Sequence, residues 1–511
     1  MYRSITTFAL VGLQPSRIRV EVSIRRGTPM LVIVGLAAGA ARECGERIRA
    51  ASSRSGLRLP GLRITVNLAP ADLPKSGAAF DLPIAVAILA ASGHIPGAAL
   101  DGLAALGELG LDGGVRPARG VLPVSLTCAP DPEVRTLIVP AANLAEASVA
   151  GGLDVRGVST LGELVAHLRG ETKLPIGRSK RPSRAASRSP DLSDVNGHHV
   201  AKRVLEIAAA GGHHILLIGE PGCGKTMLAR RLPGLLPPLR RDEAIEASIV
   251  HSVAGLLDPA EGLLSRRPYR APHHTATAAG LVGGGTRLRP GEVSLAHHGV
   301  LFLDELGEFR SGVLEALRQP LESGEVRLVR ASGALRMPAR FQLVAAMNGC
   351  PCGFVTSGDD RCVCDEWTIR RYLSRVSGPL LDRIDMTLEM SSAVWSVHAD
   401  TRAETSEIVA WRVAAARRVG RRRGQAGPNA ALDLHGLRRH GRLDDEAGAL
   451  LTAASRQAGL STRGSHRVLR VARTIADLAA ADRVGADHVA EALGYRRRVG
   501  SGVSRRSARR G

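Results

Sequence analysis

The chain has 511 residues, and its 69 lysines and arginines outnumber its 48 aspartates and glutamates to give a formal net charge of +21. A hydrophobic fraction of 44% can fill real cores, which excludes wholesale disorder, and the length suggests more than one domain. No apolar run is long enough to span a membrane, and the first residues lack the pattern of a secretion signal. A cytoplasmic protein without a membrane segment is therefore expected.

The basic excess consists almost entirely of arginine, because only five of the 69 basic residues are lysine. A single lysine, Lys225, lies beyond residue 203. A pI near 10.9 favours a polyanionic partner, with nucleic acid first, although codon bias also raises arginine content. Three arginine-rich clusters would suit contacts with a phosphate backbone: residues 178–188, residues 417–423 and the C-terminal tail.

Residues 1–170 alternate short β-like runs with helical stretches, a pattern that predicts a mixed α/β domain. The clearest strands are 18–23, 30–34, 63–67 and 136–139, and the clearest helices are 38–53 and 81–92. Residues 171–190 are rich in proline, serine and arginine without apolar periodicity. They are expected to form an exposed basic linker.

Residues 191–392 predict a second α/β domain, in which strands alternate with helices as in a parallel sheet. The expected helix is 200–210, and the expected strands are 213–219, 300–304, 341–347 and 386–390. Residues 393–495 have helical periodicity, clearest at 404–420, 444–458 and 466–481, and predict a helical lid. Residues 496–511 form a basic tail.

A phosphate-binding P-loop is predicted at residues 219–226, between an apolar strand and a helix. Its glycines let backbone N–H groups turn toward phosphates. Lys225 would bring its compact charge to the β- and γ-phosphates of ATP, and Thr226 would offer its hydroxyl to Mg²⁺. An arginine fork is too large for that place, which explains the one retained lysine. The predicted nucleotide-binding residues are Gly219, Glu220, Pro221, Gly222, Cys223, Gly224, Lys225 and Thr226.

Two later strands end in polar residues that suit ATP hydrolysis. Asp304 would hold Mg²⁺ through its water shell, and Glu305 would polarise the attacking water. The alternative for both is an ordinary strand end with solvated carboxylates. Asn348 would position the water beside the γ-phosphate, although an isolated asparagine at this place is more often a turn residue.

Two arginines are candidates for contact with the same nucleotide. Arg383 lies between two aspartates just before a predicted strand, and in a ring of ATPases it would reach the γ-phosphate of a neighbouring subunit. The alternative is a surface ion pair. Arg463 lies in the first turn of a helix that carries three arginines, and it would touch the nucleotide from the lid.

This order of motifs resembles the AAA+ ATPases, and four further segments narrow the resemblance to the YifB/ComM branch of magnesium-chelatase-like proteins. Those segments are Arg270–Thr275, Leu281–Gly285, Pro290–His297 and Cys350–Gly353. The resemblance covers nearly the whole chain. It implies an AAA+ module with a helix-2 insert and a β-hairpin before the strand that ends at Asn348. It also implies hexameric rings that use ATP and Mg²⁺ and, for ComM itself, DNA branch migration during natural transformation.

The resemblance leaves a second function open, a protein-remodelling or metal-insertion ATPase similar to the magnesium-chelatase motor subunit, with a partner protein as its target. In the DNA motor, the candidates for gripping the strand are the hairpin residues Arg327, Arg330 and Arg336. Three positions depart from the family pattern without removing a catalytic group: His298, Gly349 and Cys223. Cys223 is either an inert loop cysteine or a site of oxidation.

The N-terminal domain resembles the Lon-protease-like (S5 domain 2-like) fold through Asp72–Leu82, which is similar to the segment that carries the nucleophilic serine of Lon. Ala79 stands at the serine position, so the resemblance implies a domain without peptidase activity. Ser76 is a nearby alternative nucleophile.

Four cysteines lie close together in the sequence, at Cys350, Cys352, Cys362 and Cys364. Tetrahedral Zn²⁺ takes four soft ligands, and two pairs of thiolates would supply them. The spacing within each pair is shorter than usual for zinc. Free cysteines on a reduced loop, packing cysteines, and a redox or iron–sulfur role are the alternatives. No metal is assigned to the three histidine pairs, 213–214, 273–274 and 297–298.

Overall fold

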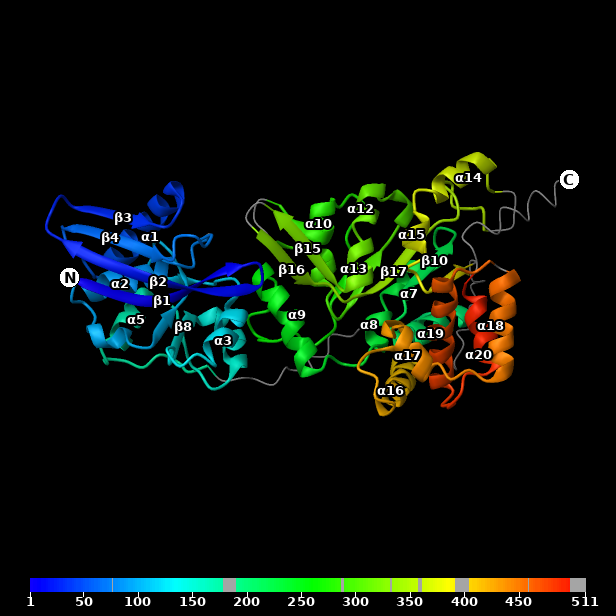
Figure 1. Cartoon of the computed structure of the whole chain (residues 1–511). Coiled ribbons are helices and arrows are strands. Elements are labelled where there is room, and N and C mark those ends of the chain that lie inside the picture. Colours follow the sequence, from blue (N-terminus) through cyan, green and yellow to red (C-terminus); the bar gives the residue numbers. More distant parts are fainter. Residues whose placement is uncertain are drawn as a thin grey trace.

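The computed structural model describes residues 1–75, 77–177, 190–285, 289–330, 333–356, 361–390, 404–457 and 459–496. These residues form an elongated molecule in which an N-terminal α/β unit, a central unit and a C-terminal helical bundle follow one another (Figure 1). Ser76, most of the predicted linker and the tail beyond Arg496 lie outside the described residues. Among the described helices, none has the length and apolar character needed to cross a bilayer.

The N-terminal unit is built on a seven-stranded mixed sheet with the order β3-β4-β2-β1-β5-β8-β9. Its strands are β1 (Tyr2–Val11), β2 (Gln14–Arg25), β3 (Met30–Val34), β4 (Arg63–Ala69), β5 (Leu103–Ala105), β8 (Thr136–Pro140) and β9 (Asp154–Val158). Its helices are α1 (Ala38–Arg54), α2 (Asp81–Ala91), α3 (Val121–Cys128), α4 (Leu144–Ala147) and α5 (Leu161–Leu168). Helix α2 is apolar on all sides, and every residue in it is buried. The predicted mixed α/β character is confirmed.

The central unit holds a five-stranded parallel sheet with the order β11-β14-β17-β10-β18. Its strands are β10 (Ile215–Gly219), β11 (Tyr269–Arg270), β14 (Val300–Leu303), β17 (Gln342–Met347) and β18 (Met386–Met390). Alternate side chains of β10 enter two separate cores, Ile215 and Leu217 on one face, Leu216 and Ile218 on the other. This two-sided burial explains why the strands are continuous apolar runs, and it confirms the predicted parallel sheet.

Short helices and an antiparallel hairpin surround this sheet. The helices are α6 (His199–Gly211), α7 (Lys225–Ala229), α8 (Leu232–Leu235), α9 (Arg241–Ala254), α10 (Ala278–Val282), α11 (Glu292–Leu295), α12 (Ser311–Glu315), α13 (Arg318–Ser323), α14 (Glu366–Leu373) and α15 (Gly378–Leu381). The hairpin pairs β15 (Glu325–Arg330) with β16 (Gly333–Pro338) and directly precedes β17. A hairpin at this place is what the family resemblance implied.

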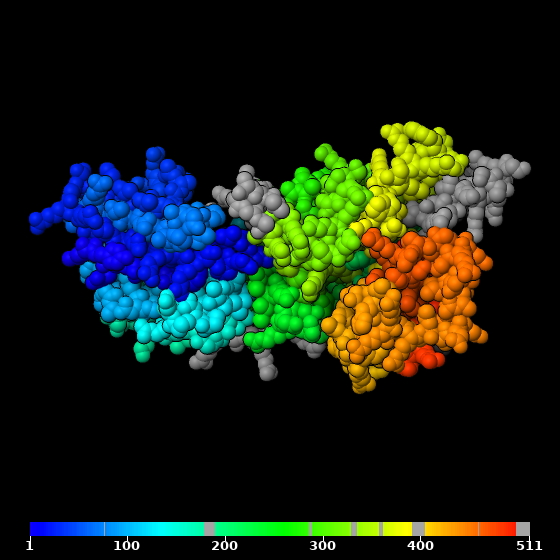
Figure 2. Space-filling model, viewed as in Figure 1, coloured from blue at the N-terminus to red at the C-terminus, as the bar shows by residue number. Residues whose placement is uncertain are grey.

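The N-terminal and central units pack against each other, as the adjoining blue and green surfaces show (Figure 2). The turn between β1 and β2 is closely packed, since a Cβ added at Gly12 would lie 1.9 Å from Leu335 of β16. At a second place, Glu146 of α4 accepts a hydrogen bond from the Ser252 hydroxyl of α9 at 2.6 Å. Burial raises the pKa of Glu146, against the opposing effect of its hydrogen bonds.

The C-terminal bundle comprises α16 (Ser406–Arg422), α17 (Leu434–His440), α18 (Asp445–Gln457), α19 (Thr462–Leu478) and α20 (Ala486–Gly494). Helix α19 begins four residues before the predicted start, because the Ser461 hydroxyl caps it by accepting a hydrogen bond from the Gly464 amide. Residues of α16, α19 and α20 share a core with one face of the parallel sheet. The bundle is therefore packed firmly on the central unit.

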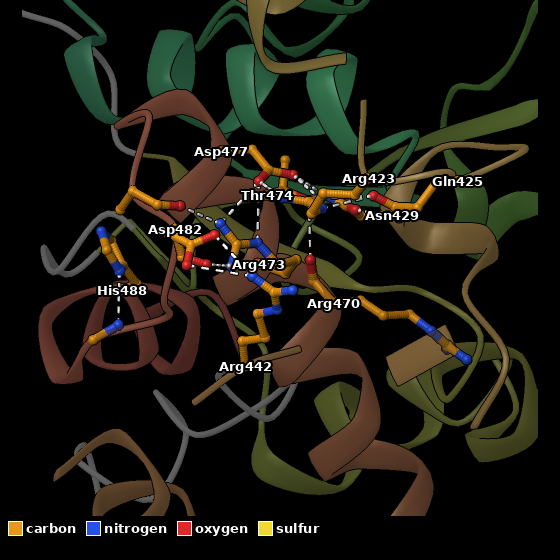
Figure 3. Close-up of polar contacts among 12 residues, drawn as sticks. Arg423, Gln425, Asn429, Arg442, Arg470, Arg473, Thr474, Asp477, Asp482 and His488 are labelled. Carbon is orange, nitrogen blue, oxygen red and sulfur yellow. Dashed lines mark hydrogen bonds and ion pairs between the residues drawn. The ribbon is translucent and has the colours of Figure 1, made fainter. Parts of the chain in front are cut away.

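A buried polar network ties the helices of the bundle together (Figure 3). Arg473 of α19 is fully buried, and its guanidinium donates to the Asp477 carboxylate at 3.1 Å. The same carboxylate accepts hydrogen bonds from Arg423 at 2.7 Å and from Asn429 at 2.8 Å. Burial lowers the pKa of Arg473, and the nearby charge of Asp477 acts in the opposite direction and favours the charged guanidinium.

Replacing Asp477 with alanine is expected to destabilise the bundle by about 3–5 kcal/mol, because it leaves Arg473 buried without its counter-charge. The loss should be measured by hydrogen exchange at the amides of α19, which reports the stability of this segment alone. Asp482→Ala is the matched control, since the Asp482 side chain meets Arg442 at an exposed place. Its expected effect is below about 1 kcal/mol. Equal effects of both substitutions would contradict the prediction.

Candidate nucleotide-binding site

The P-loop connects β10 to α7, and its backbone requires glycine at several positions. Gly222 and Gly224 have φ angles of +80° and +88°, in the left-handed region that other residues rarely adopt. A Cβ at Gly219 would come within 2.5 Å of the Met390 carbonyl oxygen on β18. The glycines of the motif are therefore demanded by the conformation of the loop and by its packing.

The Lys225 ammonium group lies inside the P-loop, and the residue as a whole is 8% exposed. It donates hydrogen bonds to the carbonyl oxygens of Gly219 at 2.7 Å and Glu220 at 2.8 Å. It also donates to the Asn348 side-chain oxygen at 3.2 Å, at the end of β17. Two of the predicted site residues are thus brought together from positions 123 residues apart in the chain.

Thr226 and Asp304 form the second junction of the site. The Thr226 hydroxyl, in the first turn of α7, donates to the Asp304 carboxylate at 2.7 Å. Asp304 directly follows β14, and its other oxygen accepts from the Glu305 amide at 3.0 Å. A hydroxyl beside a carboxylate offers the hard oxygen ligands that Mg²⁺ prefers, so these residues fit the ion that was predicted for them.

Glu305 has a positive φ of 51°, a conformation uncommon for residues other than glycine. Its side chain is half exposed and lies 2.9 Å from His274, measured from a carboxylate oxygen to Nδ1. His274 follows β11, the strand next to β14. The contact of His274 with this carboxylate was not predicted, because β11 and β14 become neighbours only through the order of strands in the sheet.

Arg383 and Arg463 belong to a separate group of residues centred on Glu322 of α13. The Arg383 guanidinium lies 2.5 Å from one Glu322 oxygen, and that of Arg463 lies 3.9 Å from the other. The hydrogen bond and charge of Arg383 hold the pKa of Glu322 below its ordinary value. Within one chain, both predicted arginines are therefore engaged in an ion-pair cluster, while the P-loop residues form the first group.

Asp385 joins the start of β18 to the helical bundle and was not predicted as a site residue. Its buried carboxylate accepts a hydrogen bond from the His214 amide at 3.0 Å and lies 3.6 Å from the Arg467 guanidinium. Burial alone would raise the pKa of Asp385, but contacts with His213, His214 and Arg467 outweigh it and lower that pKa. This buried charge links the bundle to the sheet edge near Arg383.

The four clustered cysteines are brought together in space, and all are free thiols. The sulfur of Cys350 lies 3.3 Å from that of Cys352 and 3.8 Å from that of Cys362, and Cys352 and Cys362 are 3.7 Å apart. The four sulfur atoms, including that of Cys364, lie within 4.8 Å of one another. A tetrahedral zinc ion with Zn–S bonds of about 2.3 Å separates its sulfur ligands by about 3.8 Å, so the arrangement fits this metal.

The histidine pairs are engaged in other contacts. The ring of His213 lies 2.8 Å from the Thr474 hydroxyl in the bundle. The rings of His297 and His298 both meet one Glu246 oxygen, at 3.2 Å and 2.8 Å. His298, one of the departures from the family pattern, has a left-handed backbone with φ of 56°.

The predicted phosphate contacts of residues 417–423 need correction. Arg417 donates to the Ala209 carbonyl oxygen at 2.7 Å, and its burial lowers its pKa to about 10. Arg423 faces inward and pairs with Asp477. The exposed arginines of this cluster are Arg418, Arg421 and Arg422. The pattern of the sequence could not separate them, because the inward arginines bind carbonyl and carboxylate groups of distant segments.

The β15–β16 hairpin carries two exposed arginines side by side. Arg327 and Arg336 are direct partners in the antiparallel register, and Arg327 also lies 2.5 Å from Glu325. Like charges opposite each other on two strands repel, so an anion bound over them would be favourable. The side chain of Arg330 lies outside the described residues.

The architecture and the site together define a P-loop protein of the AAA+ class. The P-loop follows β10, the Asp-Glu pair follows β14, the asparagine follows β17, and a helical bundle packs on the sheet. Comparison with known families agrees. Magnesium chelatase, subunit ChlI, matches residues 191–397, the subunit ChlI of Mg-chelatase matches residues 20–143, and the ChlI C-terminal family matches residues 403–496.

Relatives identify the branch of this class. The chain is 44% identical to competence protein ComM of Haemophilus influenzae over 96% of both chains. It is 43% identical to YifB of Escherichia coli, again over 96% of both chains. It is 29% identical to the magnesium-chelatase 67 kDa subunit of Heliobacterium mobile, over 30% of this chain and 27% of that one. The chain belongs to the YifB/ComM family of magnesium-chelatase-like AAA+ proteins, a family that implies the use of ATP and Mg²⁺.

Proposed function

We propose that the protein is an ATP-hydrolysing AAA+ ring motor that translocates on DNA in the cytoplasm. The observation that carries the ATPase is the junction of Thr226 with Asp304 and of Lys225 with Asn348. It gathers a phosphate-binding cation, a pair of magnesium ligands and a polar amide at the carboxyl ends of three neighbouring strands. Ligands of open α/β sheets bind at this edge.

Each residue of this junction has one task in the proposed reaction. Lys225 and the P-loop amides bind the phosphates, and Thr226 and Asp304 hold Mg²⁺, whose charge neutralises the phosphate oxygens when it is bound. Glu305 polarises the attacking water, and Asn348 orients it. The Glu305 side chain is half exposed, and its carboxylate contacts the ring of His274 at 2.9 Å.

The arginine cluster at Glu322 supports a role between subunits. Arg383 lies in the turn after α15 and Arg463 lies on α19, and the two guanidinium groups meet different oxygens of one carboxylate. In a hexamer we assign Arg383 to the γ-phosphate of the neighbouring subunit, and Arg463 to the nucleotide from the bundle. Both guanidinium groups would exchange the Glu322 carboxylate for phosphate oxygens, with which arginine also forms bidentate hydrogen bonds.

Two observations support DNA as the substrate. Arg327 and Arg336 lie opposite each other on an exposed hairpin, and the chain carries a net charge of +21. The relative from Haemophilus influenzae carries the name competence protein. A protein-remodelling or metal-chelatase-type ATPase is the second candidate, favoured by the matches to the magnesium-chelatase ChlI subunit along the chain. In that case the hairpin would meet a partner protein.

The test compares ATP hydrolysis with and without a DNA four-way junction. DNA is expected to stimulate the wild-type enzyme, and Arg327→Ala combined with Arg336→Ala should lower the slope of log affinity against log salt by about two. Arg49→Ala combined with Arg58→Ala removes the same charge from the N-terminal unit and should leave that slope unchanged. If no DNA structure changes the rate of ATP hydrolysis and no strand is displaced, the result would favour the protein-remodelling candidate.

We also propose a structural zinc ion at Cys350, Cys352, Cys362 and Cys364. The support is the set of four free sulfur atoms within 4.8 Å of one another. Among the alternatives, packing cysteines would not require all four sulfur atoms to converge on one point. A cluster of soft thiolates selects zinc over the hard ions magnesium and calcium.

A further inference from the structure

The cysteine segment, residues 350–364, touches the P-loop at two places. Arg361 donates a hydrogen bond to the Glu220 carboxylate at 2.9 Å. Gly353 is so close to Pro221 that a Cβ at Gly353 would lie 2.7 Å from the proline ring. Gly353 also has a φ of +91°, which favours glycine. Both contacts are made to residues inside the predicted nucleotide-binding motif.

Each contact is adjacent to a sulfur ligand. Gly353 follows Cys352, and Arg361 precedes Cys362. At the start of the segment, Cys350 lies two residues after Asn348, which accepts a hydrogen bond from Lys225. An ion that joins the four sulfur atoms would therefore hold Asn348, Gly353 and Arg361, which all contact the P-loop, in one rigid arrangement.

The contact between Arg361 and Glu220 is electrostatically important for the loop. Glu220 is only 4% exposed, so its carboxylate depends on donors within the protein. The Arg361 guanidinium also lies over the Phe354 ring, 4.7 Å from the ring centre. Phe354 and Arg361 both come from the cysteine segment, so the cation that meets Glu220 is oriented by the fold of that segment.

We propose that metal bound by the four cysteines organises the P-loop through Arg361 and Gly353, so that zinc occupancy and nucleotide affinity are coupled. The inference rests on the proposed ATPase function and assigns Arg361 as a positioning residue, which acts on the nucleotide through Glu220. Coupling between two sites is reciprocal, because each ligand favours the same arrangement of the protein. Bound nucleotide must then raise the affinity for zinc.

The experiment measures zinc binding and nucleotide binding on the full-length protein. Zinc content is determined first on purified protein, with one ion per chain expected. The equilibrium partition of zinc between the protein and a chromogenic chelator is then measured with and without a non-hydrolysable ATP analogue, and the analogue is expected to raise the zinc affinity about tenfold. For the nucleotide, Arg361→Ala should weaken binding of the analogue about tenfold, with Arg361→Lys recovering part of the loss.

Arg370→Ala is the matched control, because Arg370 lies nearby on α14 and pairs with Glu366 instead of the P-loop. It should keep the effect of nucleotide on zinc affinity, whereas Arg361→Ala should abolish this effect while retaining one zinc per chain. A zinc affinity that does not change with nucleotide in the wild-type protein would overturn the coupling. Folded protein without zinc would overturn the metal site and the coupling together, yet it would leave the ATPase proposal intact if hydrolysis persisted.

Discussion

Glu305→Gln is expected to lower the turnover number for ATP about a thousandfold while ATP binding is retained. The glutamine keeps the size and the hydrogen-bonding capacity of the side chain, but it cannot polarise water as a base. The P-loop and the pair of Thr226 with Asp304 remain intact, so the nucleotide still binds. Steady-state hydrolysis gives the turnover number, and titration with a fluorescent ATP analogue gives the dissociation constant.

The control for this substitution is Glu308→Gln. Glu308 lies three residues further along the chain and pairs with Arg375 at the surface. Its replacement should leave hydrolysis within about twofold of wild type, because exposed ion pairs contribute little. A Glu305→Gln protein that hydrolyses ATP at the wild-type rate would show that another group activates the water.

Lys225→Ala is expected to weaken binding of Mg-ATP about a hundredfold and to abolish hydrolysis with it. A charge-assisted hydrogen bond contributes about 1.5–3 kcal/mol, and the ammonium group provides the main positive charge inside the loop. Isothermal titration calorimetry measures the affinity directly. Circular dichroism confirms that the variant is folded.

Lys225→Arg tests shape separately from charge. Lys225 is 8% exposed, and its ammonium group lies among the carbonyl oxygens of its own loop. A planar guanidinium does not fit there, so the arginine variant should fail as the alanine variant does. Lys173→Ala, on the exposed surface of the N-terminal unit, should bind Mg-ATP normally. Full activity of Lys225→Arg would mean that only the charge matters.

Elements that are set by local or periodic patterns could be predicted from the sequence. The apolar runs that became β10, β14, β17 and β18 are buried strands of one parallel sheet. The helical periodicity after residue 404 became the bundle, with the start of α19 shifted by its serine cap. The partners of individual side chains could not be predicted in the same way. Arginines of the same cluster point outward at Arg418 and inward at Arg417 and Arg423.

The sequence by itself determined the P-loop, because its glycines, lysine and threonine act within eight consecutive residues whose order specifies their geometry. It also determined which polar residues end the neighbouring strands. Only the tertiary structure decided that His274 lies at Glu305 and that Arg361 meets Glu220, 141 residues away. The physical reason is that such contacts depend on strand order and on how a loop folds over its neighbour, and neither leaves a periodic trace along the chain.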